Sequence, residues 1–222
     1  CICIGMTLHG GVIAACGTFF VFSDYMKPAV RMAALMELTV KFIWTHDAFR
    51  VGEDGPTHEP VEQEAQIRLM EKLKNHSGKN SMLVLRPADS LETTECWRMA
   101  MENTDSPTGL IFSRQNIEQL PEGTDYAQAE KGAYIVAGSE ENPDVILVAS
   151  GSEVSTLAAG AKLLREDGIK VRIVSCPSEG LFRSQPAEYQ NAVLPCGAKS
   201  FGLTAGLPVN LQGLVGCNGK VF

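Results

Sequence analysis

The sequence has 222 residues, an apolar fraction of 45% and a formal net charge of −7. This composition suits one large or two ordinary globular domains with a buried core, and it argues against disorder. Acidic and basic residues are interspersed, without the Lys and Arg cluster that displaces counterions from a nucleic acid. Every apolar run is broken well short of about 18 residues, so we expect no membrane span and no signal peptide. Nucleic acids and membranes are therefore not expected as partners.

The cysteines indicate a reducing compartment. Seven of them are scattered along the chain, an odd number without a paired CxxC framework. This pattern predicts reduced thiols, as in a cytoplasmic protein. Cys1 and Cys3 form a CxC, which either binds a metal or places small apolar residues on a buried helix. Without a second pair at metal-ligand spacing, we favour the buried helix.

The first half of the chain alternates helices and strands. The pattern predicts the tail of a helix at 1–11, a short strand or buried turn at 17–22, helices at 23–37, 59–74 and 89–103, and strands at 39–45, 81–85 and 108–113. Helical spacing in the second of these helices predicts a core face made of Met26, Val30, Ala33, Ala34 and Met36. In the third, four-residue intervals predict a buried face made of Val61, Ala65, Leu69 and Leu73. Asp89, with Glu92 three residues later, predicts a capping box for the fourth.

The composition changes at 120–131, where Pro121, Gly123 and several acids interrupt the apolar period and predict a linker. Beyond it we expect strands at 132–137, 145–149 and 170–175, a helix from 150 to 166, a loop at 177–182 and a short helix at 187–194. The chain is therefore predicted to hold two α/β domains, at 1–119 and 132–222, each a mainly parallel sheet flanked by helices. Both ends look cut, so we expect part of a longer chain.

The stretch WTHDAFRVGEDGPTHEP at 44–60 concentrates polar chemistry after a predicted strand. It contains His46 and His58 with several carboxylates around a turn from Gly52 to Gly55. Open α/β sheets place their ligands at the carboxyl ends of such strands. The alternative is a solvated loop that caps the following helix, because loops are polar without being catalytic.

Four aromatic residues follow the first predicted strand: Phe19, Phe20, Phe22 and Tyr25. Side chains at this spacing pack in a core or clamp a flat heteroaromatic ring, and periodicity does not separate the two interpretations.

Two further segments allow anion binding. Arg114 follows a buried strand, where its guanidinium suits a phosphate or an ion pair with a neighbouring loop. The run Ser150-Gly151-Ser152 precedes a helix, where a simple N-cap is favoured over an anion seat.

The sequence closely resembles the transketolase family at these residues. The motifs that carry the resemblance are LHGG (8–11), TFFVFSDY (18–25), AVRMAALM (29–36), THD (45–47), GEDGPTHEP (52–60), LRPAD (85–89), SRQN (113–116), KGAY (131–134), PDVILVASGSEV (143–154) and LP (194–195). GEDGPTH together with SRQN is specific, and GEDGPTH argues against a pyruvate dehydrogenase β subunit. The resemblance covers part of a pyrimidine-binding domain of the thiamine diphosphate-binding fold and much of a Rossmann-like C-terminal domain.

The resemblance implies an enzyme of the pentose phosphate pathway. Transketolases use thiamine diphosphate and Mg²⁺ to move a two-carbon ketol (glycolaldehyde) unit from a ketose phosphate to an aldose phosphate. The cofactor lies at the interface of a homodimer, where one subunit's N-terminal domain holds the diphosphate and metal. The partner's pyrimidine domain holds the aminopyrimidine ring. This chain is thus expected to contribute no metal ligand of its own.

Site residues follow from the resemblance by matching positions. Phe19, Phe22 and Tyr25 match the pocket for the aminopyrimidine ring, whereas Phe20 keeps its core assignment. His58 matches the catalytic histidine near the cofactor's amino group and the substrate oxygens, which transfers a proton or stabilises a developing alkoxide.

Three other positions match substrate-binding residues. His46 and Arg114 resemble part of the clamp on the substrate phosphate, and Asp54 resembles the residue that hydrogen-bonds a substrate hydroxyl.

The sequence departs from the family pattern in two ways. The activating glutamate and the whole diphosphate-binding domain are missing, so this chain alone is expected to be inactive. Ala48-Phe49-Arg50 replaces a more usual Ser-Ile-Gly, and Arg50 is expected to face solvent rather than to contact phosphate. Three alternatives stay open: another thiamine diphosphate enzyme such as dihydroxyacetone synthase, the C-terminal subunit of a split transketolase with a complementary N-terminal chain, and a non-catalytic interaction module.

Overall fold

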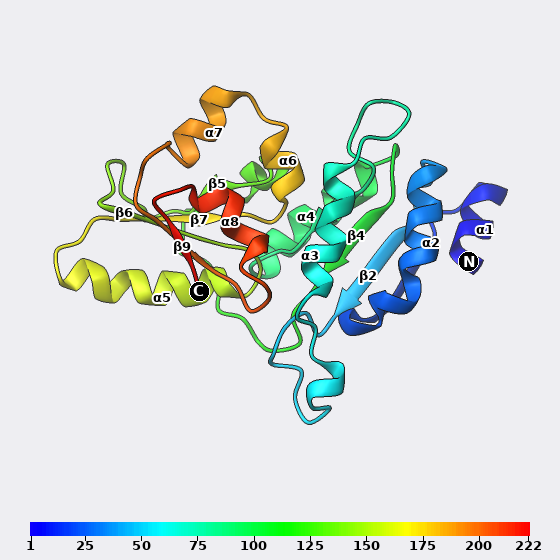
Figure 1. Cartoon of the computed structure of the whole chain (residues 1–222), viewed down its shortest axis with the longest axis horizontal. Coiled ribbons are helices and arrows are strands. Elements are labelled where there is room, and N and C mark those ends of the chain that lie inside the picture. The colour runs from blue at the N-terminus through cyan, green and yellow to red at the C-terminus, as the bar shows by residue number, and fades with distance from the viewer.

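Two β-sheets, each flanked by helices, lie side by side along the long axis of the chain (Figure 1). The computed structural model describes all 222 residues. The α/β fold class expected from the sequence is confirmed, because both sheets are mainly parallel. No helix of the structure has the length and hydropathy that would let it span a bilayer.

The first sheet has four parallel strands in the order β1-β2-β4-β3. Its strands are β1 (Ala15–Phe19), β2 (Lys41–Thr45), β3 (Leu83–Leu85) and β4 (Thr108–Ile111). Its α-helices are α1 (Ile2–His9), α2 (Ser23–Leu35), α3 (Gln63–Arg68) and α4 (Ser90–Glu102), with 3-10 turns η1 (Phe20–Phe22), η2 (Pro56–His58) and η3 (Leu69–Lys72). Since the strands run in one direction, the residues that follow all four meet at one edge.

The second sheet has five strands in the order β5-β7-β6-β8-β9, and only β5 is antiparallel to its neighbour. Its strands are β5 (Tyr134–Ile135), β6 (Val145–Ala149), β7 (Val171–Ser175), β8 (Ser200–Leu203) and β9 (Lys220–Val221). Its helices are η4 (Tyr126–Lys131), α5 (Glu153–Glu166), α6 (Glu179–Arg183), α7 (Ala187–Val193) and α8 (Val209–Val215).

The hydrophobic cores contain several of the residues that the sequence predicted to be buried. Phe20, Phe42 and Trp44 are buried in the first core, where Val30 and Ala33 of α2 also pack. Met36, by contrast, is 41% exposed, because α2 ends at Leu35 and the chain turns away from the core. The strand expected at 145–149 is β6, and its last four residues are fully or nearly fully buried.

The predicted buried face of the helix over 59–74 is wrong. The regular helix is only α3, and Leu69 and Leu73 are 59% and 51% exposed. The buried side chains are instead Ile67 and four polar residues: Gln63, Glu64, Arg68 and Glu71. Their partners lie partly in the second domain, since Arg68 Nη2 donates to Ser150 Oγ at 2.9 Å and Ser178 Oγ donates to Glu71 Oε1 at 2.6 Å. A polar stripe is therefore buried because another domain satisfies its hydrogen bonds.

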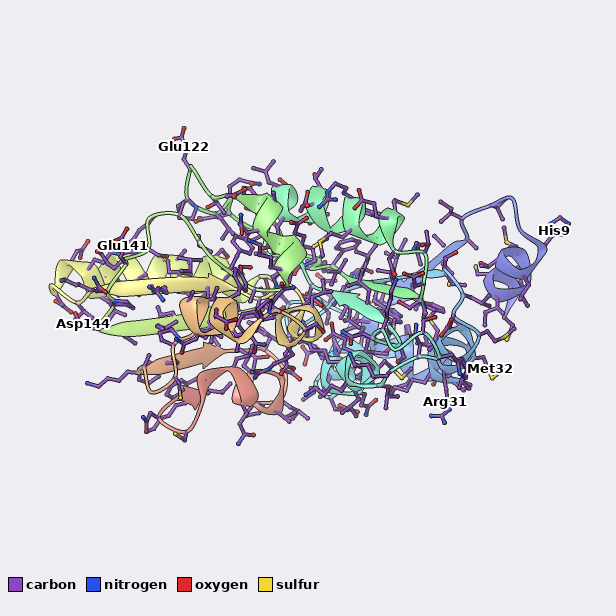
Figure 2. The ribbon with its side chains drawn as sticks, turned by 90° about the horizontal axis from the view of Figure 1, so that it is seen from above. His9, Arg31, Met32, Glu122, Glu141 and Asp144 are labelled. Atoms are coloured by element: carbon purple, nitrogen blue, oxygen red, sulfur yellow. The ribbon has the colours of Figure 1, made fainter.

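Helix α1 also differs from its prediction. It was expected to be a buried helix carrying the CxC, but none of its residues is buried and Ile2 is 83% exposed. The helix lies at one extremity of the long axis, with His9 at its tip and Asp144 near the opposite end (Figure 2). Within the chain no element covers its outer face. All seven cysteines are free thiols.

Two connecting segments are more ordered than their composition suggested. The residues 177–182, expected as a loop, contain most of α6. The segment 120–131 contains η4, and its Leu120 and Ala129 are buried. Tyr126 donates a hydrogen bond from its hydroxyl to Asp89 at 2.6 Å, so this segment is tied to the start of α4 while Glu122 projects into solvent (Figure 2).

Candidate active site at the carboxyl edge of the first sheet

The loop that follows β2 carries both predicted site histidines. His46 has a left-handed backbone with a φ of 59°, which turns the chain sharply at the end of the strand. Gly52 and Gly55 supply further positive φ values of 92° and 75°. Pro56 then begins η2, whose last residue is His58. In Figure 1 this loop projects below the first sheet, on the side of the strand ends.

The aromatic residues after β1 contact both histidines. Phe19 stacks on His46, with ring centroids 3.7 Å apart and planes 14° apart. His58 sets its edge against Phe22 at 5.3 Å and 83°. Tyr25 continues the row, 6.1 Å from Phe22. Side chains separated by up to 39 positions in the sequence, from Phe19 to His58, therefore form one aromatic surface.

Exposure separates the members of this cluster. Phe20 is fully buried beside Trp44, as expected for a core residue. Phe19 and Phe22 are half-buried, and Tyr25 is 84% exposed. Part of each of the Phe19, Phe22 and Tyr25 side chains therefore remains exposed. An exposed aromatic face can stack on a flat heteroaromatic ring.

Each histidine is oriented by the threonine before it. His46 Nδ1 hydrogen-bonds with Thr45 Oγ1 at 3.0 Å, and His58 Nδ1 with Thr57 Oγ1 at 2.9 Å. Neither Nε2 atom has a hydrogen-bond partner within the chain. Both imidazoles can therefore use Nε2 to donate to, or accept from, a ligand.

Arg114 lies on the same edge and is exposed, with no carboxylate partner in the structure. The ion pair considered from the sequence is therefore absent. Its guanidinium lies against Gly52, where an added Cβ would come within 3.1 Å of Arg114 Cζ. The glycine thus lets the histidine loop and Arg114 approach closely. Asp54 is exposed on this loop, and its carboxylate makes no hydrogen bond within the chain.

Two residues that received no role from the sequence lie beneath these side chains. Asp47 is 6% exposed, and its Oδ2 accepts hydrogen bonds from Arg86 Nε at 2.9 Å and from Ser113 Oγ at 3.0 Å. Arg86 is 2% exposed and follows β3. Two signals were available: Asp47, Arg86 and Ser113 each come just after a strand of the same parallel sheet, and each lies in a motif that carries the family resemblance.

The segment before α5 corrects a prediction. Ser152 occupies the N-cap position but its side chain makes no capping hydrogen bond, and Ser150 instead accepts from Arg68. The carbonyl of Ser150 accepts from Arg86 Nη1. Gly151 has a φ of 66° and lies against the Arg86 guanidinium. The segment before this helix therefore holds arginine side chains rather than a serine cap.

Arg50 is exposed, and the expectation that it faces solvent rather than a phosphate stays a prediction. Its Cζ lies 5.6 Å from the centroid of the Phe49 ring, and both side chains are exposed. They line a cavity of about 330 Å³ with Gln115, Asn116 and the first turns of α5.

The aromatic side chains at this edge fit one part of the implied cofactor, its flat ring. The exposed aromatic faces fit the aminopyrimidine ring of thiamine diphosphate. No group of three or more His, Cys, Asp or Glu side chains is arranged to hold a metal ion. The chain presents partly exposed aromatic rings on which a flat ring can stack.

These features define an α/β protein that presents aromatic and imidazole side chains at the carboxyl edge of a parallel sheet. The family model "Transketolase, pyrimidine binding domain" matches residues 1–119, and "Transketolase-like TK C-terminal domain" matches residues 132–222. A transketolase of Bacillus subtilis (strain 168) is 48% identical over 198 residues, which cover 88% of this chain and 28% of the relative. The chain therefore belongs to the transketolase family.

Solved structures agree with this assignment. A transketolase from Leishmania mexicana superposes with a TM-score of 0.88 at 37% identity, over 99% of this chain and 31% of that chain. A split-gene transketolase, an inactive β4 tetramer, shares the fold with a TM-score of 0.72 at 21% identity, over 99% of this chain and 69% of that chain. The chain spans only 28% to 32% of the length of the curated relatives that it matches.

Proposed function

We propose that this chain is the pyrimidine-binding and C-terminal part of a transketolase, which transfers a two-carbon ketol unit from a ketose phosphate to an aldose phosphate in the pentose phosphate pathway. One observation carries the proposal: two imidazoles with free Nε2 atoms lie against partly exposed aromatic rings at the carboxyl edge of the sheet. The division into domains at 1–119 and 132–222, joined by 120–131, belongs to the same proposal.

Phe19, Phe22 and Tyr25 would hold the aminopyrimidine ring by stacking and edge contacts, each worth roughly 1 kcal/mol beyond the buried area. When bound, thiamine diphosphate supplies the carbanion chemistry of the reaction. As the family resemblance implies, the diphosphate and Mg²⁺ would be held by a separate N-terminal domain.

His58 is the proposed catalytic residue. Its edge contact with Phe22 and its Nδ1 hydrogen bond with Thr57 fix the ring, so Nε2 is presented to a ligand in one orientation. From there the imidazole would hold or move a proton at a substrate oxygen and stabilise negative charge that develops on it.

His46, Asp54 and Arg114 are proposed to bind the sugar phosphate. The Arg114 guanidinium has no internal ion pair, so its charge is available for planar bidentate pairing with a phosphate. His46 would add one donor through Nε2. Asp54 would accept a hydrogen bond from a substrate hydroxyl, and the combined contacts would orient the reacting carbon.

The proposed partners are sugar phosphates and an N-terminal domain, supplied within a homodimer of a longer chain or by a complementary chain. The second arrangement is suggested by the likeness of fold to a protein described as a split-gene transketolase, an inactive β4 tetramer. Free thiols throughout are consistent with the proposed cytoplasmic location.

The test is to titrate thiamine diphosphate with Mg²⁺ into the 222-residue chain, alone and mixed with the N-terminal domain of a homologue, and then to assay ketol transfer. Activity only in the mixture, lost in a Phe22→Ala variant and kept in an exposed Leu163→Ala variant, supports the proposal. A folded chain that neither binds nor gives activity in the mixture would instead favour a non-catalytic interaction module.

A further inference from the structure

Asp47 connects the two strand ends that carry the proposed phosphate ligands. It is the residue after His46, and its Oδ2 accepts a hydrogen bond at 3.0 Å from Ser113, the residue before Arg114. One buried carboxylate oxygen thus holds the loop after β2 beside the segment after β4. The other oxygen, Oδ1, is buried without a hydrogen-bond partner, so Asp47 is held through Oδ2 alone.

Arg86 supplies the positive charge that this buried carboxylate requires. Its Nε and Nη2 lie 2.9 Å and 2.8 Å from Asp47 Oδ2. A buried carboxylate of this kind is strongly unfavourable without a paired cation. The charge of Arg86 is secure, because burial lowers its pKa but Glu153, Asp47 and Glu64 raise it further, to well above the ordinary value.

The second domain holds the other side of the guanidinium. Arg86 Nη1 lies 2.7 Å from Glu153 Oε2 and also donates to the Ser150 carbonyl, while Nη2 donates to Glu153 Oε1 at 3.2 Å. The backbone of Arg86 joins the same domain, through its N–H to the Pro177 carbonyl at 2.9 Å and its carbonyl to the Gly151 N–H at 3.1 Å. The position of Arg86 is therefore fixed by the start of α5 and by the segment after β7.

We propose that Asp47 and Arg86 are positioning residues for phosphate binding, and that the second domain sets the spacing of His46 and Arg114 through Glu153. This inference rests on the proposed function of His46 and Arg114 as phosphate ligands. The chain of contacts runs from Glu153 to Arg86, to Asp47, and then to both ligand-bearing segments. Through these contacts the second domain takes part in substrate binding.

The deciding variant is Ser113→Ala, which removes one hydroxyl and disconnects the Arg114 segment from Asp47. The 222-residue chain is labelled with ¹⁵N, and the His46 ring nitrogens and Arg114 Nε–H are followed by NMR without ligand and during titration with inorganic phosphate. Ser113→Thr keeps the hydroxyl and serves as the rescue variant. Ser81→Ala is the matched control, since it removes a buried hydroxyl hydrogen bond at the amino end of β3.

In the ligand-free chain we expect Ser113→Ala to shift the signals of both His46 and Arg114, and Glu153→Gln to do the same from the second domain. Phosphate affinity should fall about fivefold in each, the size expected for the loss of about one ordinary hydrogen bond. Ser113→Thr and Ser81→Ala should behave like the parent chain. Asp47→Asn should reduce the phosphate affinity further if this variant folds. If it does not fold, Ser113→Ala and Glu153→Gln decide whether the positioning role holds.

The two proposals fail in different ways. If the His46 and Arg114 NMR signals of the parent chain do not change on addition of phosphate, these residues are not phosphate ligands. The positioning role of Asp47 and Arg86 at a phosphate site is then overturned as well. A second result would overturn the positioning role alone. In that case the parent chain binds phosphate through His46 and Arg114, and folded Ser113→Ala and Glu153→Gln have the same NMR signals and phosphate affinity as the parent.

Discussion

Glu92 and Ser175 form a hydrogen bond across the boundary between the two sheets, with Ser175 Oγ donating to Glu92 Oε1 at 2.8 Å. The Tyr134 hydroxyl donates to the same oxygen at 2.7 Å. Glu92 lies in the first turn of α4, whereas both donors belong to strands of the second sheet. The same carboxyl group accepts the Ala88 N–H, one residue before the Asp89 cap, rather than the Asp89 N–H of the predicted capping box. Glu92 therefore joins the start of α4 to the second domain.

This arrangement makes stability depend on pH. Burial raises the pKa of Glu92 to about 7, from 4.5, although hydrogen bonds from Tyr134, Ala88 and Ser175 oppose the shift. Between these values the folded chain binds more protons than the unfolded chain. The contribution of Glu92 is thus fully present below about pH 4.5 and is lost as pH rises through about 7. The total loss is on the order of 3 kcal/mol.

Glu92→Gln should remove this dependence. We expect the variant to gain stability relative to the parent chain as the pH rises from 5 to 8, approaching about 3 kcal/mol, because it buries no charge. Urea denaturation at a series of pH values measures the difference. Glu102→Gln on the same helix is the control, because its side chain is 63% exposed and should change little. Parallel pH profiles for Glu92→Gln and the parent chain would contradict the assignment.

Gly151→Ala should destabilise the junction between the domains. An added Cβ would lie 2.6 Å from Arg86 Cζ, and the φ of 66° is unfavourable for alanine. Since the guanidinium is held on all sides, we expect a loss of more than about 2 kcal/mol. Gly160→Ala, inside α5 with nothing within 4 Å of its added Cβ, should instead stabilise the chain by up to about 1 kcal/mol. Equal effects of the two changes in thermal denaturation would refute this account.

The orientation of α3 predicts unequal effects of two neighbouring truncations. Ile67 is 1% exposed within the first core, whereas Leu69 is 59% exposed. Ile67→Ala should cost about 2–5 kcal/mol of unfolding free energy. Leu69→Ala should cost less than about 0.5 kcal/mol, as is usual at the surface. If Leu69→Ala were the more damaging change in chemical denaturation, the face predicted from the sequence would have been the buried one.

The phosphate ligands make a kinetic prediction for a complete enzyme formed from this chain and an N-terminal domain. Replacing His46 or Arg114 with Gln should raise KM for a phosphorylated donor about tenfold or more, since each removes a contact to a charged group. KM for a donor without a phosphate should hardly change. Steady-state assays with the two donors measure this split, and an equal rise for both would remove these residues from the phosphate site.

His58→Ala has a different expected signature in the same assay. Loss of a group that moves a proton on the reaction coordinate should lower kcat by a factor on the order of 10². The effect should appear with phosphorylated and non-phosphorylated donors alike. Near-normal turnover would exclude His58 as the catalytic residue.

The alternation of strands and helices, and the sheet edge at which the candidate site lies, could be predicted from the amino-acid sequence. Apolar runs such as 145–149 and the Asp89 cap are local signals, and each structural element follows from a few neighbouring residues. Because consecutive strands are parallel, polar residues after 45, 85 and 111 had to meet at one edge. The aromatic, His58 and Arg114 assignments needed the family motifs as well.

The residues that are buried between the domains could be identified only from the folded chain. Leu69 and Leu73 satisfied the helical period but face solvent, while Arg68 and Glu71 are buried because the second domain supplies their partners. The role of Asp47 depends likewise on contacts with Arg86 and Ser113, 39 and 66 positions away. Periodicity reports which side chains avoid water on average, and it carries no information about which distant donor or acceptor makes the burial of a charge favourable.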